Sequence, residues 1–159
     1  MKGVLINTGN KYFTFLKYIF SSINNIQKEY NWLITEHECY PQTIEYAGML
    51  SGNYCWVTGD ELTDMIEKED FQWIWGVFSA FPKDVRVEDV LKYRLPKADG
   101  YTGFWENPIS IQHPLAEIEI IAWDSSMTII ISKNTSIINI FKMKNPLAQD
   151  LEKYNENKM

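Results

Sequence analysis

The stretch EIEIIAWDSSMTIIIS, residues 117–132, decides the fold that this sequence predicts. Two runs rich in Ile, Trp, Met and Thr flank the polar triplet Asp124-Ser125-Ser126. β-Branched and aromatic runs of about 5–6 residues around a polar break are typical of two antiparallel strands joined by a tight turn. Successive residues such as Ile120 and Ile121 face opposite sides of a strand, and both are apolar. We therefore expect this strand pair to be covered on both faces and central in its sheet.

Outward from this hairpin, strand-like and helix-like patterns share the chain. We expect strands over residues 2–7, 32–39, 54–57 and 71–81. We expect helices over 11–28 and 85–95, and further helices that begin at the capping box Thr58–Glu61, at a cap on Asn134 or Thr135, and at Asn145-Pro146. Residues 40–53 show no clear period and are expected to form a loop, and residues 155–159 are expected to fray. This order favours an α+β fold over a doubly wound parallel sheet. We predict a single mixed, mostly antiparallel sheet of about five or six strands with helices packed on it.

Length and composition predict one domain over residues 1–159. A chain of 159 residues with six Trp, nine Tyr and eight Phe can bury a bulky core without staples. Two cysteines, Cys39 and Cys55, are too few for a disulfide framework, and reduced thiols are the default in the cytosol. Neither a signal peptide nor an apolar run of about 18 residues occurs. We expect a cytoplasmic protein that does not enter a membrane.

The charge is unevenly distributed along the chain. The net charge is -6, but residues 29–82 hold ten acidic residues against Lys68 alone, a local net charge of -9. This acidic segment argues against nucleic acid as a partner and is compatible with a basic protein, because complementary fields steer association. Its densest part suggests a partner-binding set: Asp60, Glu61, Asp64, Glu67, Glu69 and Asp70. The alternative is that these charges serve solubility only.

The residues with catalytic chemistry form no recognisable constellation. His37 and Cys39 could supply two zinc ligands, but a closed zinc site needs four and no second pair occurs at ligand spacing. Both cysteines sit in apolar strand runs, which argues against a reactive thiolate. The pairs Glu36/Glu38 and Glu117/Glu119 suit acid–base work, yet they also fit an exposed strand face. No phosphate-binding loop occurs. We expect no catalytic residue, metal or cofactor, and an enzyme is not favoured.

One loop is the strongest candidate for a ligand site. Residues 97–114 contain two Gly and two Pro together with Tyr101, Phe104 and Trp105. Long loops of this kind often carry function. Two hypotheses therefore remain open. The first is a non-enzymatic interaction module, of the immunity or inhibitor type, with an acidic surface for a basic partner. The alternative is a small-ligand binder or enzyme with a pocket under this loop, walled by the three aromatic residues.

Several runs resemble a known family. They are AWDSSMTIIISKN (122–134) and FKMKNPLAQDLEKYN (141–155), with KGVLIN, NKY and NWLIT near the start of the chain. Together they are similar to a small uncharacterised domain family, a domain of unknown function, of Gram-positive spore-forming bacteria. The resemblance covers about half of the chain. It implies a bacterial cytoplasmic protein with an α+β fold, and it assigns no functional residues, because the family has no established activity.

Overall fold

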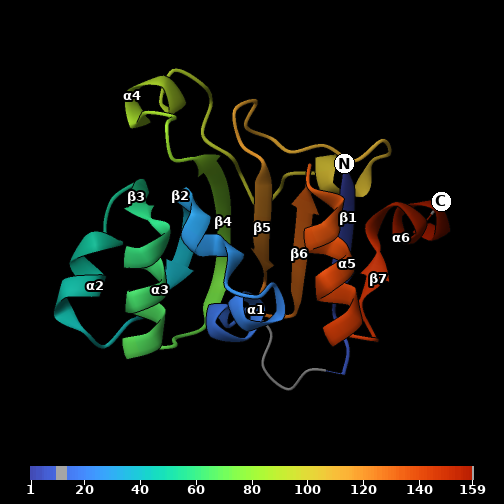
Figure 1. Ribbon diagram of the computed structural model, residues 1–159, viewed down its shortest axis with the longest axis horizontal. Helices are drawn as coiled ribbons and strands as arrows, with labels where there is room; N and C mark the ends of the chain where they lie inside the picture. The colour runs from blue at the N-terminus through green and yellow to red at the C-terminus, as the bar shows by residue number, and fades with distance from the viewer. Residues whose placement is uncertain (10–13, 159) are drawn as a thin grey trace.

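The fold is one antiparallel sheet with helices packed on it, as the computed structural model shows for residues 1–9 and 14–158 (Figure 1). The sheet has the order β3-β2-β4-β5-β6-β1-β7. Its strands are β1 (Lys2–Ile6), β2 (Tyr30–Cys39), β3 (Tyr54–Thr58), β4 (Trp73–Pro82), β5 (Ile118–Trp123), β6 (Met127–Ser132) and β7 (Gln149–Asp150). The α+β class is confirmed. The sheet has seven strands rather than five or six because the two-residue β7 adds to β1 at one edge.

The hairpin of β5 and β6 lies in the middle of the sheet, as its composition predicts. The two strands pair from Ile118 opposite Ser132 to Trp123 opposite Met127. Asp124 and Ser125 make the turn with φ of 47° and 58°, left-handed values that short polar residues adopt at hairpin turns. Nearly every residue of both strands is buried, which requires that both faces of the sheet be covered.

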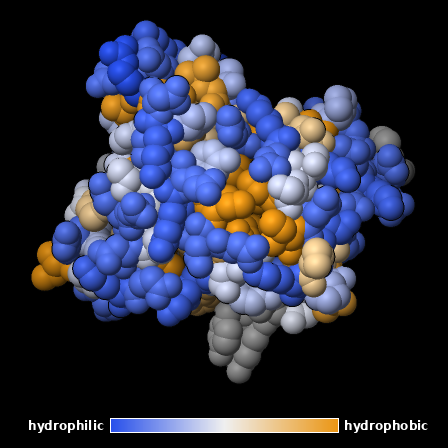
Figure 2. Space-filling view, viewed as in Figure 1, coloured by the Kyte–Doolittle hydropathy of each residue, from blue (hydrophilic) through white to orange (hydrophobic). Residues whose placement is uncertain are grey.

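Helices and a long loop cover opposite faces of the sheet. The α-helices are α1 (Leu16–Ser22), α2 (Ile44–Met49), α3 (Gly59–Lys68), α4 (Val87–Val90), α5 (Thr135–Lys144) and α6 (Leu151–Lys158), and two 3₁₀ helices span Ile26–Glu29 and Gly103–Trp105. Helices α1, α3 and α5 pack on one face through one set of strand residues. The opposite face is covered by residues 98–111 and α6. Figure 2 shows a mostly hydrophilic helix-bearing face with a hydrophobic area between α3 and α5.

The helix expected over residues 11–28 is wrong in its extent. It is divided into α1 and a 3₁₀ turn at Ile26–Glu29. Asn24 and Asn25 stand between them with φ of 56° and 57°, and Asn is one of the few residues that tolerates this left-handed region. The apolar spacing continues across the break, so the periodicity did not reveal it. Residues 11–13, the start of the expected helix, lie outside the described residues.

Four further local predictions are corrected. Residues 44–49 of the expected loop form α2. The N–H of its N-cap residue Thr43 donates a hydrogen bond to the carboxylate of Glu69. The helix expected over 85–95 is reduced to the four residues of α4. The last helix begins at Leu151 rather than at Pro146, because β7 precedes it. Asn155, expected to fray, is 2% exposed and donates a hydrogen bond to the carbonyl of Phe104.

Candidate functional site

A bulge in β2 creates the most conspicuous site. Thr35 pairs with Val77 and Glu38 with Trp75, so two residues of β2, Glu36 and His37, stand opposite the single residue Gly76. Glu36 has φ of 51°, a left-handed value that is uncommon for any residue other than glycine and asparagine. Bulges re-aim side chains and are frequent near binding sites. Here the bulge turns the carboxylate of Glu36 toward the neighbouring loop.

That loop is fixed to the sheet by side-chain hydrogen bonds. The hydroxyl of Thr35 donates to the carbonyl of Pro96 at 2.8 Å. Gln112 closes the loop, because its Oε1 accepts from the Lys97 N–H and its Nε2 donates to the Lys97 carbonyl, each at 2.9 Å. The Gln112 N–H in turn donates to Glu119 Oε2 at 3.1 Å. Residues 95–99 are thus held beside the bulge.

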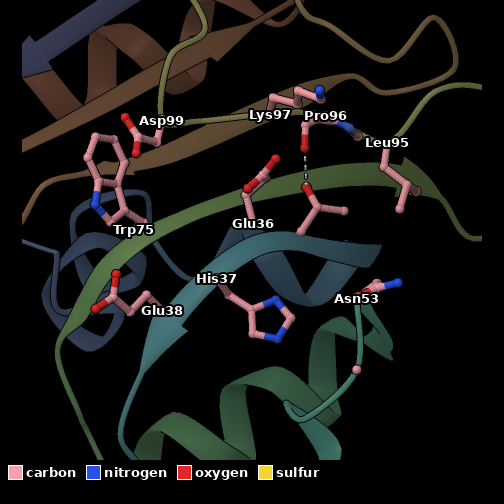
Figure 3. A pocket seen from close by; sticks show the side chains of 11 residues that line it. Glu36, His37, Glu38, Asn53, Trp75, Leu95, Pro96, Lys97 and Asp99 are labelled. Carbon is pink, nitrogen blue, oxygen red and sulfur yellow. Dashed lines mark hydrogen bonds between the residues drawn. The ribbon is translucent and has the colours of Figure 1, made fainter.

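A pocket of about 580 Å³ lies between the bulge and this loop segment. The residues that line it are Thr35, Glu36, His37, Glu38, Gly52, Asn53, Trp75, Leu95, Pro96, Lys97 and Asp99. Figure 3 shows Asp99 and Glu38 on opposite sides of the Trp75 ring, with Glu36 pointing toward Pro96 and Lys97. The volume of the pocket is in the range of small-molecule sites. The lining combines three carboxylates with one lysine, so its charge favours a cationic ligand.

His37 lies at the rim of this pocket on the side of Asn53 (Figure 3). Its Nε2 contacts the carbonyl of Leu50 at 2.6 Å. A carbonyl can only accept, so Nε2 carries a proton. Nδ1 of the ring is buried and has no hydrogen-bond partner among the described residues. His37 therefore ties the bulge to the segment that carries Leu50 and the pocket residues Gly52 and Asn53.

The three aromatic residues expected to wall a pocket lie in the core beneath the loop. Phe104 is 1% exposed, and Tyr101 and Trp105 pack half-buried against the same cluster. Trp105 contacts Trp123 with ring centroids 5.2 Å apart, and the ammonium of Lys158 lies 4.2 Å from its ring centroid. None of the three lines the pocket described above. A ligand-binding role for them stays a prediction.

The six acidic residues proposed for partner binding lie on α3 and just beyond its end. Asp60, Glu61, Asp64, Glu67 and Asp70 are exposed, whereas the opposite side of α3 is buried. The helix begins as predicted, because the Thr58 hydroxyl accepts the Glu61 N–H at 3.0 Å.

Some of these carboxylates already have partners. Asp64 pairs with Lys68 at 2.9 Å and Glu67 with Lys17 at 3.4 Å, both in exposed positions. Glu69 accepts the N–H of Thr43 at 2.9 Å and its hydroxyl at 2.6 Å, and these hydrogen bonds lower the pKa of Glu69. Asp60 and Glu61 form no ion pair within the described residues. They are therefore the two charges of the set most available to a partner.

The cysteines and His113 have the environment of structural residues. Burial raises the pKa of Cys39 to about 12 and also raises the pKa of Cys55, so both thiols remain protonated at neutral pH. Protonated thiols are poor nucleophiles. His113 is buried, its Nδ1 accepts from the Leu115 N–H at 3.1 Å, and its Nε2 lies 2.9 Å from the Val90 carbonyl. None of these three side chains is placed for acid–base or nucleophilic catalysis.

Glu119 is a buried carboxyl that the sequence presented as an exposed one. It is 0% exposed on β5, directly opposite Ser79 of β4. Burial raises the pKa of Glu119 to about 7, although the hydrogen bond from the Gln112 N–H opposes this shift. Its Oε1 and the Ser79 hydroxyl are both buried without a hydrogen-bond partner among the described residues. No group of three or more His, Cys, Asp or Glu side chains suited to a metal ion occurs in residues 1–9 and 14–158.

Comparison with known proteins places the chain in a family. The family described as "Protein of unknown function (DUF2691)" matches residues 1–95, and the chain belongs to it. This confirms the resemblance to an uncharacterised domain family, while the bacterial group stays a prediction. No curated protein and no solved structure matches the chain. Within the described ranges, none of the helices is long and apolar enough to cross a membrane.

Proposed function

We propose that this member of a family of unknown function is a non-enzymatic, cytoplasmic interaction module, of the immunity or inhibitor type, that binds a basic protein partner. The observation that carries the proposal is the outer side of α3, where four carboxylates are exposed and a fifth follows just beyond the helix: Asp60, Glu61, Asp64, Glu67 and Asp70. A surface of one sign accelerates encounter with a partner of the opposite sign. The environments of the cysteines and of His113 support a role without nucleophilic catalysis.

Exposed hydrophobic side chains next to α3 support the same proposal. Tyr40 is 69% exposed and Ile44 is 89% exposed. Both adjoin the end of α3, because Glu69 binds the backbone of Gln42 and Thr43 between them. The hydrophobic area in Figure 2 lies on the other side of this helix, toward α5. Apolar contacts bordered by charges are typical of protein–protein interfaces.

The double charge reversal Asp60→Lys/Glu61→Lys tests the proposal. The tagged protein, its reversal variant and a control variant would each be used to capture partners from the lysate of its own host at low salt. We expect wild type to retain a near-stoichiometric basic protein that salt releases, and the reversal to lose it. The measurement is the amount retained at each salt step, by mass spectrometry.

The control is Glu152→Lys/Glu156→Lys on α6, which makes the same change in net charge. Glu152 and Glu156 are exposed, and α6 packs on β1 and β7, at the opposite end of the sheet from α3. The control should behave as wild type. Equal retention by all three proteins would exclude α3 as the binding surface.

A second candidate function is the binding of a small ligand in the pocket beside the 97–114 loop. It is favoured by one observation, the 580 Å³ cavity between the β2 bulge and Lys97 and Asp99 of that loop. The two functions are compatible, because a pocket of this charge also suits a side chain of a basic partner.

A further inference from the structure

The pocket beside the β2 bulge holds carboxylates that the protein itself leaves largely unused. Glu36 and Asp99 form no ion pair and accept no hydrogen bond within the described residues, and Glu38 accepts only from the Tyr40 hydroxyl at 3.2 Å. Lys97 is the only lysine or arginine in the lining and forms no ion pair there. The pocket therefore has an excess of negative charge and of acceptors. A cation that donates hydrogen bonds would satisfy both.

Trp75 gives the pocket an aromatic wall. Its ring is half-buried in the pocket wall and is held from behind by Trp123, with ring centroids 4.9 Å apart and planes at 68°. A tryptophan face attracts organic cations, and the planar guanidinium stacks on it better than an ammonium does. Figure 3 shows the carboxylates of Asp99 and Glu38 on either side of this ring. A guanidinium on Trp75 could donate to such carboxylates through its fixed fork of N–H groups.

From this arrangement we propose that the pocket binds a guanidinium group, such as the side chain of arginine. The inference deepens the proposed function, on which it rests, by naming the residue of the basic partner that the site would take. Trp75 provides the stacking face, Asp99 and Glu38 accept the N–H groups, and Glu36 adds negative charge.

Calorimetric titration of the whole protein tests this inference with defined probes. The first probe is Nα-acetyl-L-arginine methylamide, and its citrulline and lysine analogues provide the comparison. Citrulline keeps the shape without the charge, and lysine keeps the charge without the plane. We expect saturable binding of the arginine probe with Kd between about 10 μM and 1 mM, and binding at least about tenfold weaker for both analogues.

Variants place the binding in the pocket. Asp99→Asn is expected to weaken the arginine probe about tenfold, and Trp75→Leu about three- to tenfold. Glu36→Asn removes a charge but keeps a residue that tolerates the left-handed bulge, and should weaken binding less. The control Asp84→Asn removes an exposed carboxylate outside the pocket and should leave the Kd unchanged. Circular dichroism confirms that each variant is folded.

A further titration shows whether the guanidinium belongs to a free small molecule or to a side chain of a protein. Tighter binding of free L-arginine or agmatine than of the blocked residue would indicate a free small molecule, and the reverse would indicate a side chain within a protein. No saturable binding of any of these compounds, or equal weakening by Asp84→Asn and Asp99→Asn, would overturn the inference. Since no partner is needed, this failure is distinct from a failure of the α3 reversal, which would refute the basic-partner proposal and leave the pocket result intact.

Discussion

The substitution Glu119→Gln is expected to stabilise the protein at pH 8 by about 3 kcal/mol and to change its stability little at pH 5. Glu119 is 0% exposed, and burial raises its pKa from 4.5 to about 7. At pH 8 the folded protein must bury an ionised carboxylate, and among the described residues Gln112 alone supports it with hydrogen bonds. Glutamine has almost the same shape and carries no charge, so it removes this cost.

The direction of the pH dependence follows from proton binding. Between about pH 4.5 and 7 the folded state retains a proton on Glu119 that the unfolded state has released. The contribution of Glu119 to stability is therefore fully present below pH 4.5 and is lost as the pH rises to 7 and above. The pKa of Glu119 differs by about 2.5 units between the unfolded and the folded state, so the loss in free energy of unfolding amounts to about 3 kcal/mol. Urea denaturation at pH 5, 6, 7 and 8 measures it.

The control for Glu119 is Glu106→Gln, an exposed position in the 97–114 loop. It should leave the pH dependence of wild type unchanged, whereas Glu119→Gln should flatten it. If Glu119→Gln destabilises the protein equally at pH 5 and pH 8, then the carboxyl serves as an ionised hydrogen-bond acceptor and the burial argument is wrong.

The substitution Gly59→Ala is expected to destabilise the protein by about 3 kcal/mol or more. Gly59 is the first residue of α3, and a Cβ there would lie 2.1 Å from the carbonyl oxygen of Gln27 and 2.7 Å from that of Tyr30. Both obstacles are backbone atoms, which cannot turn aside as a side chain can. Since the Gln27 side chain also donates to the Thr63 hydroxyl at 3.0 Å, relief of the clash would disturb the packing of α3 on the turn 26–29.

The control for Gly59 is Gly48→Ala in α2. No atom lies within 4 Å of a Cβ at Gly48, so alanine should stabilise the protein by about 0.5–1 kcal/mol through its higher helix propensity. Both variants are measured by urea denaturation with circular dichroism. A loss of less than about 1 kcal/mol for Gly59→Ala would show that α3 can move away from residues 27–30 at little cost.

The elements that the sequence predicted well are those with unambiguous periodicity or capping chemistry. The isoleucine-rich strands of residues 118–132 had apolar residues on both faces, and they are central. Thr58 is an N-cap whose hydroxyl accepts from the Glu61 N–H, as predicted. Of the two predicted caps for α5, Asn134 or Thr135, it is Asn134 whose side chain accepts from the Ser136 N–H. The break at Asn24 and Asn25 left the apolar spacing intact, so only backbone geometry reveals it.

The pocket could not be predicted because it depends on contacts between distant segments. Glu36 and Glu38 read as alternating residues of an exposed strand face, and nothing in the sequence indicates a bulge between Thr35 and Glu38. Trp75 and Asp99 are 24 positions apart in the sequence, and both line the pocket. The hydrogen bond from Thr35 to the Pro96 carbonyl holds the segment that carries Asp99 beside β2. In the 97–114 loop the predicted aromatic residues pack against the core, while Lys97 and Asp99 line the pocket. Glu119 was misread because alternation alone does not show that a loop covers that face.

The most direct test of the interaction proposal is the rate constant for association between this protein and the basic protein recovered by capture. It would be measured by stopped flow at about 20 mM and about 300 mM salt for wild type, Asp60→Lys/Glu61→Lys and the α6 control. We predict that the wild-type rate falls about tenfold or more at the higher salt, that the α3 reversal lowers the rate at low salt several-fold, and that the control matches wild type. Equal low-salt rates for all three proteins, or the recovery of no basic protein, would contradict the proposal.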